Sequence, residues 1–166
     1  GTALLSNDFF QISLVHAAGP ELGSYAYMML PGMSSSDLLT FANSPTISLI
    51  EGSSDIHAAY DSANKLLGAN VWSKATNLIA LGGNKSVVVS DPASLFIRET
   101  ASAFDVVITD PSANGTGSVV LTFNFNSSAI SPAQVPGLTI LQLSPLKISL
   151  ARSAMKRTPI AFTINK

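Results

Sequence analysis

The stretch SVVLTFNFN, residues 118–126, decides the fold class of this chain. Four apolar residues stand at every second position of the stretch, namely Val119, Leu121, Phe123 and Phe125. Because successive side chains of a β-strand point to opposite faces, this period of two predicts a strand with one face in a core. We therefore expect these four side chains to be buried.

The same signal recurs along the chain, in short runs rich in β-branched and aromatic residues. Turn sequences such as LGGNKS (residues 81–86) and DPSANGTG (residues 110–117) separate the runs, at a spacing of roughly eight to twelve residues that is typical of a β-sandwich. The fold class expected is all-β, with antiparallel β-sandwich domains and few short helices. The expected strands are residues 9–15, 24–30, 46–50, 86–90, 94–99, 105–110, 118–125, 138–143, 146–151 and 160–165.

Helical signals are few. SSSDLLTFAN (residues 34–43) opens with helix-capping residues and predicts a short helix. Residues 55–72 are ambiguous, because their period permits a helix that Gly68 and Asn70 would interrupt. A boundary near Ser44-Pro45 divides the chain into two expected domains, residues 1–45 and residues 46–166.

The composition suits a secreted β protein. Hydrophobic residues make up 46% and charged residues only 11%, so serine, threonine and asparagine must supply much of the polar surface. The absence of cysteine excludes disulfides, thiolate metal sites and a cysteine nucleophile. No apolar run is long enough to span a membrane, and a pI of about 6.1 argues against nucleic-acid binding. The chain starts at Gly1, where we expect a processing site, a boundary chosen for expression or the start of a fragment.

Charge is distributed unevenly. All ten acidic residues precede residue 111, whereas the residues after it include five basic ones. One interpretation is that this basic tail packs against the acidic remainder and the charges cancel; the other is a basic edge that contacts a polyanion. The second interpretation names Lys147, Arg152, Lys156 and Arg157 as the contact residues.

Catalytic and metal-binding motifs are missing from the sequence. His16 and His57 are the two histidines, and neither has a second ligand at metal-binding spacing. Each is better explained as a structural histidine at a strand end than as a catalytic base. There is no nucleophile elbow, P-loop or dinucleotide fingerprint. We therefore assign no catalytic residue, no metal ligand and no cofactor.

Three N-x-[ST] sequons begin at Asn84, Asn114 and Asn126, each in or beside an expected turn where a glycan has room. They are either ordinary turn asparagines or glycosylation sites of a secreted eukaryotic glycoprotein.

The segment order resembles polysaccharide lyase family 8, the hyaluronate, chondroitin and xanthan lyases and their relatives. His16, Pro20, the Tyr25-Ala26-Tyr27 block and Leu30-Pro31-Gly32 follow the pattern at the end of that family's central β-sandwich, although Ala17 replaces the usual glycine. Ala69-Asn70-Val71-Trp72, Arg98-Glu99 and Thr109-Asp110-Pro111 match segments of the family's C-terminal β domain. The resemblance covers residues 9 to about 125.

The resemblance implies β-elimination beside a uronic acid, with the catalytic asparagine, histidine, tyrosine and arginine in an N-terminal α/α-toroid domain. That region is not part of this sequence, so no catalytic residue carries over. The favoured hypothesis is a C-terminal portion of a secreted lyase, inactive alone, whose partners are the remaining N-terminal part of the same enzyme and an anionic polysaccharide. The alternative is an autonomous carbohydrate-binding β-sandwich module without catalysis.

Overall fold

The computed structural model describes residues 13, 25–112, 115–156 and 158–166. The chain divides into two compact units, Gly1–Thr40 and Phe41–Lys166, each of which is described by itself. The expected strand over residues 9–15, together with His16 and Pro20, lies outside the described residues except for Ser13.

The first unit contributes an extended segment and the start of a helix. Residues 25–30 form no strand, contrary to the expected strand over residues 24–30. A strand requires a neighbouring backbone to pair with, and the described residues of this unit supply none. Tyr25 and Tyr27 lie beside each other in this segment: their rings stack with centroids 6.3 Å apart, and both side chains are exposed.

Helix α1 (Ser35–Asn43) confirms the helix expected over residues 34–43. Ser34 caps it, because its Oγ accepts a hydrogen bond of 3.2 Å from the backbone N–H of Asp37. The same hydroxyl donates to the Asp37 carboxylate at 2.6 Å, so two hydrogen bonds link the capping residue to the first turn of the helix.

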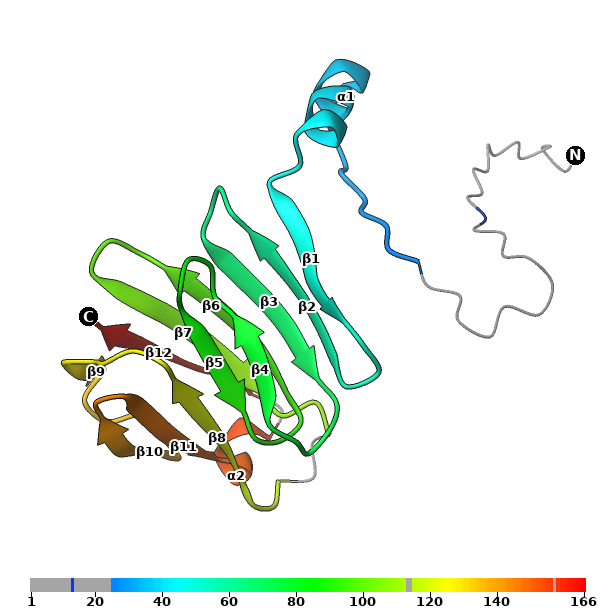
Figure 1. Cartoon of the computed structure of the whole chain (residues 1–166). Helices are drawn as coiled ribbons and strands as arrows, with labels where there is room; N and C mark the ends of the chain where they lie inside the picture. Colours follow the sequence, from blue (N-terminus) through cyan, green and yellow to red (C-terminus); the bar gives the residue numbers. More distant parts are fainter. Residues whose placement is uncertain (1–12, 14–24, 113–114, 157) are drawn as a thin grey trace, which may run out of the picture. The chain divides into compact units, whose positions relative to one another are not determined.

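The second unit is a sandwich of two antiparallel sheets, which confirms the predicted fold class (Figure 1). The seven-stranded sheet has the order β1-β2-β3-β6-β7-β12-β9 and the five-stranded sheet the order β10-β11-β8-β5-β4. The strands are β1 (Ile47–Gly52), β2 (Ile56–Asp61), β3 (Leu66–Val71), β4 (Asn77–Ala80), β5 (Ser86–Val89), β6 (Ala93–Glu99), β7 (Ala103–Thr109), β8 (Ser118–Phe123), β9 (Ala129–Ser131), β10 (Leu138–Leu143), β11 (Leu146–Ala151) and β12 (Ile160–Asn165), with a short helix α2 (Arg152–Met155) before β12.

The ambiguous stretch over residues 55–72 is the β2–β3 hairpin. Its turn is built by Asp61, whose Oδ1 accepts hydrogen bonds from the backbone N–H groups of Ala63 and Asn64 at 3.0 and 3.3 Å. The Asn64 side chain donates to Oδ2 of the same carboxylate at 2.6 Å and lowers the Asp61 pKa. Lys65 completes the turn with a φ of 50°, a left-handed conformation that is compatible with a tight turn.

The core lies between the two sheets. The alternation of apolar residues over residues 118–126 points one face of β8 into it, as predicted. Val119, Leu121 and Phe123 are buried, and Phe125 is partly buried with its ring stacked on Phe104 at 4.6 Å. Strands β6, β11 and β12 alternate in the same way. One face of each sheet therefore packs in the core, while the other face is available for function.

The turn between β4 and β5 confirms the hairpin predicted at residues 81–86. Gly82 and Gly83 both adopt positive φ, 84° and 57°, which glycine permits without strain. The side-chain amide of Asn124 stabilises the turn through two hydrogen bonds. Its Oδ1 accepts one from the Ser86 N–H at 2.8 Å, and its Nδ2 donates one to the Asn84 carbonyl at 2.7 Å.

Candidate functional site

His57 lies on β2 and points away from the core, between the buried residues Ile56 and Ala58. The strand conformation removes the one-turn proximity to Asp61 that a helix would have produced. The His57 imidazole and the Trp72 indole form a T-shaped pair, with ring centroids 6.2 Å apart and planes at 79°. The described residues contain no group of three histidine or acidic side chains arranged to bind a metal ion.

The basic residues that the structure describes in the tail do not all lie exposed along one edge. Lys147 and Lys156 are exposed, and Arg157 lies outside the described residues. The expectation that Arg152 contacts a polyanion is wrong, because its side chain is only 7% exposed and its guanidinium is occupied inside the protein. For Arg152, the interpretation that basic and acidic charges cancel is the one that fits, because Arg152 pairs with acidic residues from the earlier part of the chain.

Arg152 ties the two sheets together at one end of the sandwich. Its Nη1 lies 2.7 Å from Asp110 Oδ1, at the end of β7, and its Nη2 donates to the Pro92 carbonyl at 3.0 Å, just before β6. Burial opposes ionisation of Asp110, but hydrogen bonds from Ser112 and Arg152 outweigh it and hold the Asp110 pKa below its ordinary value. This cluster is a structural ion pair.

Lys166 forms a second internal cluster, which also supports charge cancellation in the tail. Its Nζ donates to Glu99 Oε1 at 2.8 Å and to the Thr100 carbonyl at 2.7 Å. Lys85 lies 3.2 Å from the same carboxylate oxygen. The hydrogen bond from Lys166 is the largest cause of a lowered Glu99 pKa.

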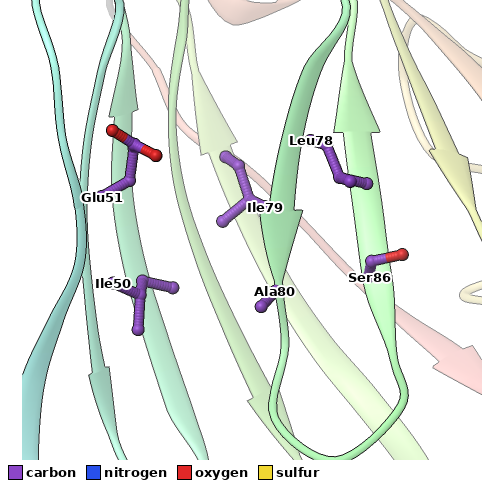
Figure 2. Close-up of a pocket in the computed structure, with 6 residues that line it drawn as sticks. All are labelled: Ile50, Glu51, Leu78, Ile79, Ala80 and Ser86. Carbon is purple, nitrogen blue, oxygen red and sulfur yellow. The ribbon is translucent and has the colours of Figure 1, made fainter.

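A pocket of about 210 Å³ lies where β1 and β4 come close, at the edge of the sandwich (Figure 2). Its lining is mostly apolar, and Glu51 supplies the one carboxylate among the residues that line it. A lone carboxylate without a partner acid, base or cation offers no acid–base pair for catalysis. The lining residues are Ile50, Glu51, Leu78, Ile79, Ala80 and Ser86.

The outer face of the seven-stranded sheet combines exposed aromatic rings with polar side chains. The cross-strand register aligns His57 with Asn70 and Asn70 with Ser94, so three polar residues form a row across β2, β3 and β6. We call the surface that this row makes with its neighbours the aromatic–polar face. Its members are His57, Asn70, Trp72, Ser94, Phe96 and Arg98.

Specific contacts hold the members of the aromatic–polar face in place. Ser94 Oγ donates to Asn70 Oδ1 at 2.7 Å, and the backbone N–H of Trp72 donates to the Asp55 carbonyl at 2.8 Å. Phe96 lies against Gly68, where a β-carbon would be 3.1 Å from the Phe96 ring. This face combines exposed aromatic rings, hydrogen-bonding side chains and a cation, and it is the candidate functional site.

The sequence signals did not locate this face, because residues 55–72 could not be assigned to helix or strand. Without that assignment, the positions of His57, Asn70 and Trp72 relative to Phe96 and Arg98 stay undefined. The alternation of buried Leu67, Ala69 and Val71 is the signal that would have found it.

Of the sequon asparagines, Asn84 and Asn126 are exposed, Asn84 in the β4–β5 turn and Asn126 after β8, while Asn114 lies outside the described residues. No helix in the described part of the chain has both the length and the apolarity needed to cross a membrane.

Comparisons with known proteins relate part of the chain to one lyase family. Residues 48–119 match the model of the C-terminal beta-sandwich domain of polysaccharide lyase family 8. The chain is 26% identical over 131 residues to a xanthan lyase of Bacillus sp. strain GL1, and 29% identical over 93 residues to the hyaluronate lyase HylB of Enterococcus faecalis. These matches cover 78% and 56% of the chain but only 13% and 9% of the two relatives.

Solved structures agree at the level of the fold. A Paenibacillus xanthan lyase superposes with a TM-score of 0.68 at 24% identity, over 82% of this chain and 13% of that one. A chondroitin AC lyase of Streptomyces coelicolor A3 gives a TM-score of 0.67 at 15% identity, over 82% of this chain and 17% of that one. The chain thus spans less than a fifth of the proteins it is similar to.

Proposed function

We propose that this chain carries the C-terminal β-sandwich domain of polysaccharide lyase family 8, and that the whole protein cleaves a uronic-acid-containing polysaccharide by β-elimination. The observation that carries the proposal is the family match over residues 48–119. The named relatives, a xanthan lyase and a hyaluronate lyase, support the substrate class.

In the proposed reaction, a base removes the proton from C5 of the uronate and the C4–O bond breaks. A C4=C5 double bond forms, and an acid protonates the departing oxygen. The reaction needs a base, an acid and a neutralising group for the carboxylate. In the described residues, the clusters around Arg152 and Glu99 are ion-paired internally, so neither presents a free base beside a free acid. The role proposed for this chain is therefore structural and substrate-supporting, without catalysis.

The proposed domain arrangement keeps the boundary near residue 45. Residues 1–45 end the central β-sandwich, whose remaining strands come from the preceding part of the same enzyme, and residues 46–166 form the C-terminal domain. The protein is proposed to be secreted, since its substrate is a large anionic polysaccharide. Exposed Asn84 and Asn126 are proposed as glycan attachment sites, together with Asn114.

The test is a lyase assay on two proteins, the whole protein and the 166-residue chain alone. Each is incubated with xanthan, hyaluronate and chondroitin, and the unsaturated uronate product is detected by its ultraviolet absorbance. We expect product from the whole protein on at least one polysaccharide and none from the chain alone. Absence of product from the whole protein on every uronate polymer would overturn the proposal.

A further inference from the structure

We propose that the aromatic–polar face binds a segment of uronate-bearing polysaccharide without cleaving it, and so acts as a secondary binding surface. The identity of the ligand, though not the existence of the site, rests on the proposed function. Nothing in this surface contributes to the β-elimination described above. The proposal depends on the rings, the polar row and the arginine of this face.

The two rings provide stacking surfaces. Phe96 is 57% exposed although it lies in the middle of the sheet, and Trp72 is 49% exposed at the end of β3. Gly68 lets the Phe96 ring lie close to the strand, where its position is fixed on one side. The C–H groups of a pyranose ring carry partial positive charge and pack well on the negative face of an aromatic ring. A fixed, solvent-facing ring is therefore suited to a sugar.

The polar row provides hydrogen bonds beside those rings. Asn70 Oδ1 already accepts a hydrogen bond from Ser94 Oγ, whereas Asn70 Nδ2 has no hydrogen-bond partner among the described residues. The imidazole of His57 is exposed next to Asn70 in the register. Because adjacent strands are about 4.8 Å apart, the row from His57 to Ser94 spans about 10 Å. That span corresponds to a disaccharide, whose hydroxyls both donate and accept.

Arg98 provides the preference for a uronate. It follows Phe96 by two residues on β6, so both side chains point to the same face, and it is 60% exposed. Its Nη2 donates to Asp105 at 2.7 Å, but a guanidinium has five donors and the others are left for a sugar carboxylate. The neighbouring Asp105 opposes a strongly anionic ligand, so we expect weak binding.

A protein partner fits this face less well than a glycan does. The exposed apolar side chains of the five-stranded sheet lie on its two edge strands, Leu78 on β4 and Ile140, Leu141 and Leu143 on β10. Exposed edge strands with apolar side chains are the surfaces that pair with other proteins. On the aromatic–polar face, in contrast, separate rings alternate with hydrogen-bonding groups.

The test is a titration of the 166-residue chain, followed by the amide signals of its nuclear magnetic resonance spectrum. The probes are a hyaluronate tetrasaccharide, which carries uronates, and cellotetraose, which is neutral. We expect saturable shifts at amides of β2, β3 and β6 with the hyaluronate probe. Trp72→Ala and Phe96→Leu should each weaken binding about tenfold, in line with the loss of one stacked ring. Arg98→Gln should remove the preference for hyaluronate over cellotetraose.

Leu141→Ala on β10 is the matched control, since it removes an exposed apolar side chain from the other sheet. Trp72 lies at the end of β3, so its variant should fold even if Phe96→Leu destabilises the strand at Gly68. Three outcomes would overturn the site. They are binding of neither probe, amide shifts confined to β4 or β10, and a loss of affinity in Leu141→Ala equal to that in the ring variants. Equal binding of both probes by the unaltered chain would overturn the uronate assignment. The readout needs no catalysis, so a negative lyase assay with positive binding refutes the proposed function alone.

Discussion

The guanidinium of Arg152 lies 2.7 Å from the carboxylate of Asp110 and joins the end of β11 in one sheet to the end of β7 in the other. Both side chains are buried, with 7% and 0% of their surface exposed. Removing one partner leaves a charge buried without compensation, which is strongly destabilising. The ion pair between these two residues thus links the two sheets.

Asp110→Asn should lower the free energy of unfolding by roughly 3–5 kcal/mol, because buried Arg152 would keep its charge with only the more distant Asp91 carboxylate, 3.9 Å from its Nη2, as a counter-ion. Urea denaturation of the chain measures the change. The matched control is Asp105→Asn, which breaks the Arg98–Asp105 pair at the same 2.7 Å distance on an exposed face. Exposed pairs contribute about 0–1 kcal/mol. Equal losses in the two variants would contradict the assignment of Arg152 as a link between the sheets.

Stability should fall as the pH drops below about 5, because the pKa values of Glu99 and Asp110 are lower in the folded chain than their ordinary 4.5 and 3.8. The unfolded chain then binds more protons than the folded chain. The stabilisation is complete above the ordinary values and is lost as the pH falls through the lower folded ones. Urea unfolding at pH 7, 5, 4 and 3 measures this dependence. Glu99→Gln should flatten part of the slope, and an unaltered slope would count against the Lys166–Glu99 bond.

Gly82→Ala should destabilise the β4–β5 hairpin more than Gly83→Ala does. Both residues have positive φ, but a β-carbon at Gly82 would clash with the Tyr60 hydroxyl, whereas none of the surrounding atoms lies near Gly83. Gly83→Ala should cost about 1 kcal/mol from the backbone alone, and Gly82→Ala about 1–3 kcal/mol more from the crowding. Thermal unfolding of the two variants measures the difference. Equal effects would show that Tyr60 does not pack on this turn.

Expression in a eukaryotic secretory host should add glycans at Asn84 and Asn126, because both are exposed, Asn84 in the β4–β5 turn and Asn126 in the segment after β8. Mass spectrometry before and after enzymatic removal of N-glycans measures the addition. Asn84→Gln and Asn126→Gln should each eliminate one glycan, while Asn124→Gln, outside any sequon, should eliminate none. An unmodified polypeptide mass in the secreted material would contradict the glycosylation proposal.

The sandwich could be predicted from the sequence because alternation and turn residues are local signals. The period of two alone predicts that Val119, Leu121 and Phe123 lie in the core, and the two glycines of residues 81–86 predict the turn. The β2–β3 hairpin was not predictable in this way, since Leu66-Leu67 and Ala58-Ala59 are compatible with both periods. Pairing with β6 decides between them, and pairing is a long-range property that a local window does not contain.

The functional and structural sites are less predictable from the sequence than the fold is, because they depend on three-dimensional contacts. Arg152 looked like one cation of a basic tail, and only the fold brings it beside Asp110, 42 positions earlier, at a buried location. The aromatic–polar face likewise combines residues from β2, β3 and β6 that no spacing along the sequence associates. The aromatic and apolar composition of residues 24–30 predicts a strand, but residues 25–30 do not form one among the described residues because strand formation also requires a partner.

The most direct test of the central claim is the size of the native particle that contains this chain. Material from the natural source is separated by native mass, and every fraction is assayed for this chain and for unsaturated uronate release from polyuronates. If the chain is the C-terminal part of a lyase, activity and chain will elute together in a particle far heavier than 17.3 kDa. If the chain elutes alone at its own mass, plus any glycans, and activity elutes elsewhere or nowhere, the account is contradicted.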